Sequence, residues 1–112
     1  MFTLSVILQV ILGLGFLFFG VTKFISKQMV EGFEHFGLPQ WLRVVTGVLE
    51  ILGAAGLIVG IWNPVIAILS SIGLAITMFF AILTHARARD PFSSMVMPGI
   101  LLILLVIVAF LN

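Results

Sequence analysis

The sequence predicts an all-α integral membrane protein, a bundle of four transmembrane helices with a short interfacial amphipathic helix between spans 1 and 2. Three observations lead to this fold class. Of the 112 residues, 62% are hydrophobic and only 8% are charged, whereas soluble domains carry about 25% charged residues. Three long stretches, residues 1–22, 51–86 and 91–112, contain no Asp, Glu, Lys or Arg. Pro and Gly divide the chain into segments of about 20 residues, the length that crosses a ~30 Å hydrocarbon core.

Composition also excludes several classes of protein. A soluble domain of this size buries only about 60–70% of the surface of its unfolded chain, too little to hide so many apolar side chains. The net charge of +1 is too small for a surface that binds the phosphates of a nucleic acid. We therefore expect no nucleic-acid partner and expect the lipid bilayer as the partner instead. The absence of Cys excludes disulfides and thiolate metal sites. The first apolar run has no preceding Lys or Arg and no cleavage site, so we expect it to remain in the mature protein.

Turn residues set the limits of the spans within a single four-span domain. The charge-free stretch 51–86 would form a helix of about 54 Å if it were unbroken, so it must fold back. It can do so at residues 60–64, because Gly60 suits a helix end and Pro64 suits the first turn of the next helix. Pro39 begins another helix in the same way. The predicted spans are residues 2–24, 39–60, 64–86 and 92–111, the second being the least hydrophobic.

The segment between spans 1 and 2 has helical amphipathicity. In residues 25–36, apolar side chains repeat at a spacing of three and four, and polar ones fall between them, which predicts a short helix lying in the membrane interface. The alternative is a polar loop with a few aromatic residues. The apolar face comprises Ile25, Met29, Phe33 and Phe36, and the polar face comprises Lys27, Gln28, Glu31 and Glu34.

Basic residues predict the orientation in the membrane. Lys and Arg favour cytoplasmic ends of spans, and all five lie near the connection between spans 1 and 2 or that between spans 3 and 4. We therefore expect a cell (inner) membrane protein with both termini outside and loops 25–38 and 87–91 in the cytoplasm. Two Trp residues at opposite ends of span 2 suit interface anchors. The expected membrane-interface residues are Lys27, Trp41, Arg43, Trp62, Arg87 and Arg89.

Glu50 is the informative residue of span 2. It lies about 16 Å from the cytoplasmic start of that helix, near the bilayer midplane. An acid there costs on the order of 2.5–3.5 kcal/mol on insertion scales, so a functional site is the first hypothesis and a purely structural hydrogen bond the second. Its helix face also carries small residues at the three-and-four spacing, Thr46 or Gly47 before Glu50 and Gly53 or Ala54 after it, and small residues allow close helix contact.

Side-chain directions suggest partners for Glu50. Helical side chains lean toward the N-terminus of their helix, so Lys23 and His85, near the cytoplasmic ends of spans 1 and 3, lean toward Glu50, whereas Arg43 should extend to the headgroups. Alternatively, Lys23 is only an interface anchor, His85 only caps its helix, and the Ser and Thr residues only bind their own backbone. The candidate ligand-binding or buried polar site comprises Glu50, Lys23, His85, Thr46, Thr84 and Gln9.

Other chemistries lack the residues that they need. No His, Asp and Glu cluster has metal-ligand spacing, and the two His residues do not suit haem ligation. No Ser has both a base and an orienting acid beside it. We therefore expect no catalytic residues, no metal and no intrinsic cofactor.

Several segments resemble the DoxX family, which includes the small subunits of thiosulfate:quinone oxidoreductase. They are residues 15–24, ending in a Gly-x-x-Lys motif, residues 36–39, residues 46–53 with Glu50, residues 56–60, and His85 at the end of span 3. The resemblance covers nearly the whole chain. It implies a four-helix inner-membrane protein associated with quinone-linked oxidoreduction or oxidative stress. Because the chain has no redox centre, it would bind or present a quinone while a soluble oxidoreductase partner on the cytoplasmic side supplies electrons.

Three functions are compatible with the sequence. The first is a quinone- or lipid-binding membrane subunit, in which Glu50 and His85 accept protons near a carbonyl headgroup. A second is a proton-coupled small multidrug-type transporter, although such transporters tend to balance their basic residues between the two sides. The third is a non-catalytic adaptor that docks soluble partners through residues 27–35. The Gly-rich faces of spans 1 and 2 suit packing either within one bundle or between two copies of a homo-oligomer.

Overall fold

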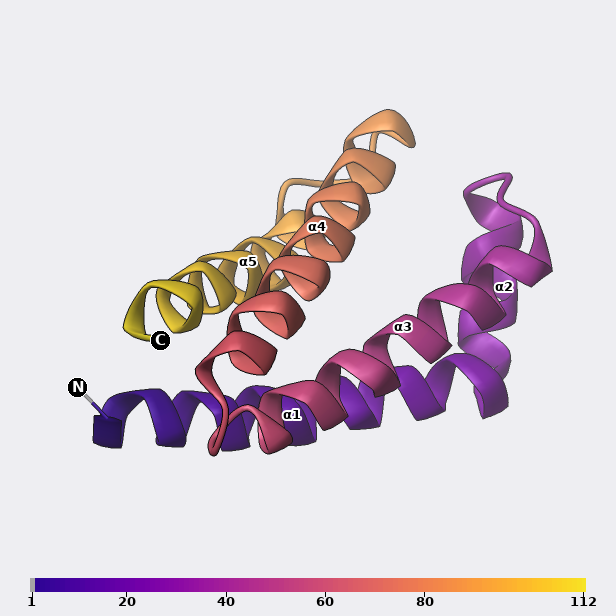
Figure 1. Cartoon of the computed structure of the whole chain (residues 1–112). Helices are drawn as coiled ribbons and strands as arrows, with labels where there is room; N and C mark the ends of the chain where they lie inside the picture. Colours follow the sequence, from indigo (N-terminus) through magenta and orange to yellow (C-terminus); the bar gives the residue numbers. More distant parts are fainter. Residues whose placement is uncertain (1) are drawn as a thin grey trace.

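The computed structural model describes residues 2–112 and places five helices in them (Figure 1). The described residues contain no strand, which confirms the all-α class. Each long helix agrees with a predicted span to within one residue at either end. The helices are α1 (Phe2–Ile25), α2 (Lys27–His35), α3 (Gln40–Val59), α4 (Pro64–Arg87) and α5 (Ser93–Leu111).

Four of the helices found in residues 2–112 are long and apolar enough to cross a membrane, namely α1, α3, α4 and α5. Their most apolar windows have mean hydropathies of 2.4, 1.9, 2.5 and 2.8, in that order. As expected, α3 has the lowest value, because it carries the charged side chains of Arg43 and Glu50. The lengths and composition are those of a multi-pass membrane protein.

The reversals of the chain have local causes. After α2, Gly37 adopts a φ of +70°, in the left-handed region that Gly enters without strain. This allows the Leu38 N–H to donate to the Phe33 carbonyl at 2.9 Å. Between α3 and α4, the Asn63 side chain accepts a hydrogen bond from the Val65 N–H at 3.1 Å, and Pro64 occupies the first turn of α4. The predicted reversal at residues 60–64 is therefore present.

The short helix α2 is amphipathic, as the sequence predicts. Its exposed residues include the whole predicted polar face, whereas Met29, Val30 and Phe33 are half-buried against the rest of the chain. Ile25 was expected on the apolar face, and this assignment is wrong. It belongs to the end of α1 and is 76% exposed, because the helix breaks at Ser26 and α2 starts in a new direction.

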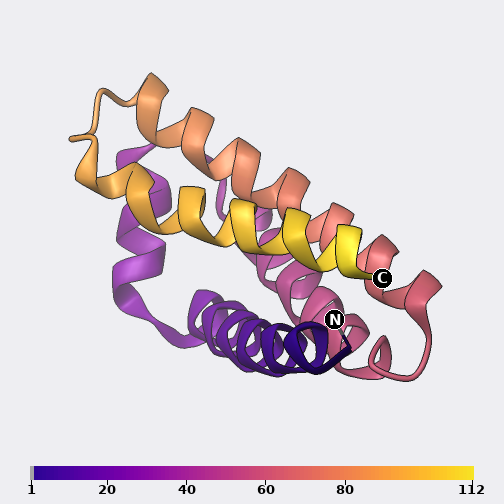
Figure 2. The ribbon, with the colours of Figure 1, turned by 90° about the vertical axis from the view of Figure 1, so that its left-hand side faces the viewer.

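Two helix pairs form the body of the molecule. The helix α1 packs against α3, and α4 packs against α5, while α3 and α4 join the pairs through their own contact. Figures 1 and 2 show that the α4–α5 pair crosses the α1–α3 pair obliquely, so that α4 diverges from α1 toward the side where α2 lies. Because consecutive long helices run in opposite directions, the ends of α1 and α4 and the start of α3 lie on this same side.

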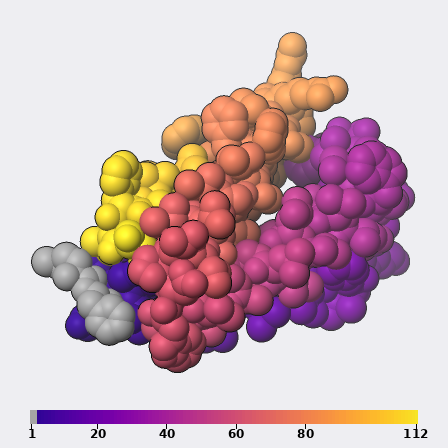
Figure 3. Space-filling view, in the orientation of Figure 1, coloured from indigo at the N-terminus to yellow at the C-terminus, as the bar shows by residue number. Residues whose placement is uncertain are grey.

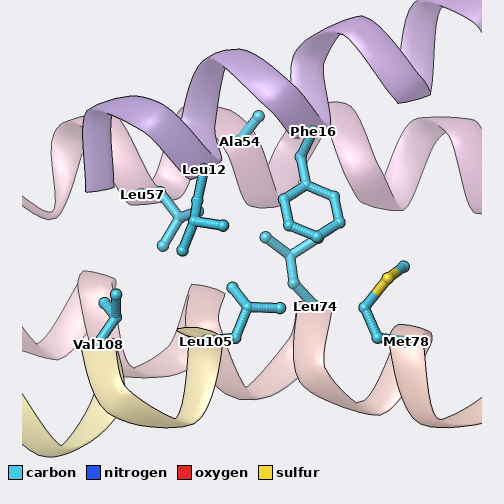
Figure 4. Packing of buried hydrophobic residues seen from close by; sticks show 8 residues of the cluster. All are labelled: Leu12, Phe16, Ala54, Leu57, Leu74, Met78, Leu105 and Val108. Atoms are coloured by element: carbon cyan, nitrogen blue, oxygen red, sulfur yellow. The ribbon is translucent and has the colours of Figure 1, made fainter. Parts of the chain in front are cut away.

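The apolar core lies where the two pairs cross (Figure 4). Only 11% of the most apolar window of α5 is buried, against 33% for α1, so α5 buries the smallest share of its residues among the four long helices. Eight buried side chains form the core cluster: Leu12, Phe16, Ala54, Leu57, Leu74, Met78, Leu105 and Val108.

Candidate functional site

A buried ion pair joins α1 to α3. The Nζ atom of Lys23 lies 2.5 Å from Oε1 of Glu50, whose side chain is 1% exposed, whereas that of Lys23 is 15% exposed. The two residues come from the last turn of α1 and from the middle of α3. The structure thus brings together the acid and the first of the two partners that the side-chain directions indicate.

Two glycines allow this contact, because they let the backbones of α1 and α3 approach each other closely. A Cβ atom on Gly20 would lie 2.9 Å from the carbonyl oxygen of Gly47, and one on Gly47 would lie 3.2 Å from Cβ of Lys23. Both are distances that real Cβ atoms rarely or never show. The glycines sit about one turn from Lys23 and Glu50 on their respective helices, so the same close approach places the ammonium beside the carboxylate.

The pair is largely isolated from other polar groups. Apart from the Lys23 ammonium, Oε1 of Glu50 has no hydrogen-bond partner among residues 2–112. A buried carboxylate is costly unless it is paired, so Glu50 depends on Lys23 for its charge compensation. The ammonium, in contrast, can donate three hydrogen bonds and keeps capacity for a further acceptor.

Arg43 differs from its expected direction. Rather than extending to the headgroups, its Nη1 donates a hydrogen bond to the backbone carbonyl of Lys23, and its Nε donates to Oε1 of Gln40 at 2.8 Å. The physical reason is that the last carbonyls of α1 have no partner within their own helix and attract a cation. Arg43 therefore holds the backbone of the residue whose side chain pairs with Glu50.

The two threonines of the candidate site bind their own helices. The Thr46 hydroxyl donates to the Leu42 carbonyl and the Thr84 hydroxyl to the Phe80 carbonyl, both at 2.8 Å. Such bonds to the carbonyl four residues earlier satisfy a hydroxyl inside an apolar helix. Neither hydroxyl donates to Glu50, so the structural alternative describes these two residues.

Gln9 belongs to a different polar cluster. Its side-chain amide donates to the Leu57 carbonyl at 2.9 Å and accepts from the Ser5 hydroxyl at 2.6 Å. The Asn112 amide donates to the same hydroxyl at 2.9 Å. Since Leu57 lies seven residues beyond Glu50, this cluster is about 10 Å further along α3. The structure therefore places Gln9 apart from the ion pair, where it ties α1 to α3 and to the end of α5.

His85 contacts Asp90 and Phe36 instead of Glu50. Its Nδ1 lies 2.8 Å from Oδ2 of Asp90, and its ring packs edge-on against Phe36 with the centroids 5.1 Å apart. Nε2 of His35 lies 3.6 Å from the other oxygen of Asp90. Neither Asp90 nor His35 was among the site residues expected from the sequence. The available signal was an acid five residues after His85 and just before a Pro. These residues connect α2 to the loop between α4 and α5.

The contacts at Asp90 predict a pH dependence. The hydrogen bond with His85 holds the pKa of the Asp90 carboxyl below its ordinary value of 3.8. A lowered pKa in the folded state contributes stability that is fully present above the ordinary value and is lost as the pH falls through the folded-state value. We expect Asp90→Asn to lower the melting temperature in detergent at about pH 5, and this difference from wild type to disappear toward about pH 2.

Glu31→Gln is the control for that measurement, because Glu31 is an exposed acid on α2. It should behave like wild type at every pH. A melting-temperature loss for Asp90→Asn that stays constant over the whole pH range would show that the residue acts through packing rather than charge.

The expected interface residues lie at the helix ends. Trp41, at the start of α3, is 66% exposed, and Trp62, just after its end, is 79% exposed, so the two rings flank this span. Lys27, Arg87 and Arg89 are exposed on the side where α2 lies. Within residues 2–112, no group of three or more His, Asp or Glu side chains could hold a metal ion.

Four apolar helices with an ion pair buried between two of them define the chain as a multi-pass membrane protein with a polar site among its helices. It belongs to the DoxX-like family, which it matches over residues 7–108, and this confirms the resemblance inferred from the sequence. The chain is 37% identical over 90 residues to a Bacillus subtilis (strain 168) protein named "Uncharacterized protein YdgD", over 78% of each chain. No solved structure matches it.

Proposed function

We propose that this chain is an inner-membrane subunit that binds a quinone, or a lipophilic compound with a similar carbonyl headgroup, at the Lys23–Glu50 pair. The observation that carries the proposal is the pair itself, an ammonium and a carboxylate whose Oε1 has no other partner, inside the helical bundle. Ligand sites are typically apolar with a few converging polar groups. The core side chains of α1 and α3, such as Phe16 and Ala54, make the interior of the bundle between these two helices apolar.

The two charges suit both redox forms of such a headgroup. An ammonium donates hydrogen bonds and so matches a quinone carbonyl, whereas a carboxylate accepts them and so matches a quinol hydroxyl. The chain would bind and present the ligand without transferring electrons itself. A soluble oxidoreductase on the cytoplasmic side would supply the electrons.

The ion pair favours this function over a cation transporter. A transported lipophilic cation would have to displace the Lys23 ammonium from the only carboxylate buried in the helices of residues 2–112. An uncharged ligand with an acceptor oxygen can instead use the donors that Lys23 keeps. Gly13 and Gly20 of α1 contact α3 of the same chain, so these glycines pack within one bundle.

Binding of decylubiquinone to the purified protein in detergent tests the proposal, with titration calorimetry as the measurement. We expect saturable binding to the wild type that weakens by about tenfold or more in Lys23→Met and in Glu50→Gln, because each change removes a hydrogen bond to a charged group. Lys27→Met and Glu31→Gln make the same chemical changes at exposed positions of α2 and should bind like wild type. Equal affinity in all five proteins would contradict the proposal.

The orientation is a separate proposal that the basic residues support, since all five Lys and Arg side chains belong to the side where α2 lies, and such residues favour the cytoplasmic side. The natural chain lacks Cys, so single cysteines report cleanly. We expect Thr3→Cys to react with an impermeant maleimide in intact cells and Ser93→Cys to react only after the cells are permeabilised. The opposite labelling pattern would place α2 outside.

A further inference from the structure

A hollow of about 180 Å³ lies between the end of α2 and the end of α4. Figure 3 views the molecule from the side on which these two parts approach each other (orange and purple). At ~30 Å³ per water, the hollow has room for about six water molecules, which is enough for a phosphate group with its nearest substituents. It is lined by His35, Phe36, Leu38, Thr84, Arg87 and Ala88.

The charged part of this lining is basic. Arg87 is exposed and forms no ion pair within residues 2–112, so its five donors remain available. The neighbouring acid, Asp90, turns its two oxygens toward His85 and His35 rather than toward an arginine. The carboxylate thus contacts His85 and faces His35, and the Arg87 charge forms no ion pair among the described residues.

The position of the hollow suits a lipid headgroup. The spanning helix α4 ends at Arg87, so the hollow lies at the level where the hydrocarbon core gives way to the headgroups. Phe36, Leu38 and Ala88 give it an apolar part beside the basic part. Basic pockets between spanning helices on the cytoplasmic side are typical sites for anionic headgroups.

We propose that this hollow binds the phosphate of an anionic phospholipid headgroup, with Arg87 as its main donor and His35 as a second. The guanidinium suits this ligand because its planar fork matches two phosphate oxygens. The site is separate from the Lys23–Glu50 pair, and its occupation does not depend on quinone binding.

Native mass spectrometry of the full-length protein, delipidated and then supplied with phosphatidylglycerol or phosphatidylcholine, tests the proposal. We expect the wild type to retain phosphatidylglycerol in preference to phosphatidylcholine. Arg87→Gln should weaken phosphatidylglycerol binding by about fivefold or more, the effect of one cation at a membrane surface. Arg87→Lys keeps the charge and should retain most of the preference.

Arg89→Gln is the matched control, because Arg89 is a second exposed arginine two residues away that does not line the hollow. It should bind phosphatidylglycerol like wild type. Equal losses in Arg87→Gln and Arg89→Gln would show only general attraction by surface charge and would overturn the proposal. Displacement of phosphatidylglycerol by excess inorganic phosphate would also overturn it, since the ligand would then be the soluble anion.

Discussion

Lys23→Met is expected to destabilise the protein by about 3–5 kcal/mol, the cost of breaking a buried ion pair by removing one partner. Glu50 is 1% exposed, and its Oε1 has no other hydrogen-bond partner among residues 2–112. The substitution therefore leaves a carboxylate in the apolar bundle without any donor to compensate it. Equilibrium unfolding in mixed detergent micelles measures the loss.

Substitution of the other partner, Glu50→Gln, should destabilise the protein less than Lys23→Met, because the two side chains differ in their access to water. Lys23 lies in the last turn of α1 and its side chain is 15% exposed, so in Glu50→Gln the ammonium can extend along the helix end to the interface. The double variant Lys23→Met with Glu50→Gln should recover much of the stability, since neutral groups often replace a buried pair without loss.

A double-mutant cycle isolates the interaction of the two side chains. Its matched control uses Lys27→Met and Glu31→Gln, which carry the same chemical changes at exposed positions of α2 and should each shift stability by less than about 0.5 kcal/mol. A coupling energy of zero between positions 23 and 50 would show that the two groups do not interact in the folded protein.

Much of the fold was predictable because the bilayer imposes strong constraints on length and polarity. A spanning helix needs about 20 apolar residues, and the turn residues near Gly37 and Pro64 mark where the chain reverses, so the limits of the spans agree to within one residue. The Lys23–Glu50 contact was also predictable. It depends on two features of sequence, namely the direction in which helical side chains lean and the glycines that let α1 and α3 meet.

The remaining site residues were harder to place, because periodicity identifies a face of a helix but not which residues of another helix lie opposite it. Gln9 shares a face of α1 with Lys23, yet it contacts Leu57, about 10 Å along α3 from Glu50. His85 leans inward as expected, but α4 diverges from α1 on that side (Figure 1). Its ring therefore meets Asp90 of the following loop and Phe36. The crossing angle of the helix pairs, which the sequence does not show, decides both outcomes.

The second large effect is expected at the point where α1 and α3 approach most closely. In Gly20→Ala, the added Cβ would lie 2.6 Å from Cγ1 of Ile51 and 2.9 Å from the carbonyl oxygen of Gly47. A side chain can rotate away, but the backbone oxygen cannot, so the helices must separate. Overpacking of this kind costs about 1–3 kcal/mol. Separation should also lengthen the contact between Lys23 and Glu50, one turn away.

Gly15→Ala is the control, because the same helix α1 offers open space there: apart from the adjacent residues and backbone of its own helix, no atom lies within 4 Å of the added Cβ. Replacing Gly by Ala inside a helix favours the helix by about 1 kcal/mol, so Gly15→Ala should be neutral or stabilising while Gly20→Ala is destabilising. Unfolding in detergent measures both variants.

If the Lys23–Glu50 contact depends on the close approach, the coupling energy between positions 23 and 50 should fall in the Gly20→Ala background and persist in the Gly15→Ala background. An unchanged coupling in both would mean that the glycine contact does not position the ion pair.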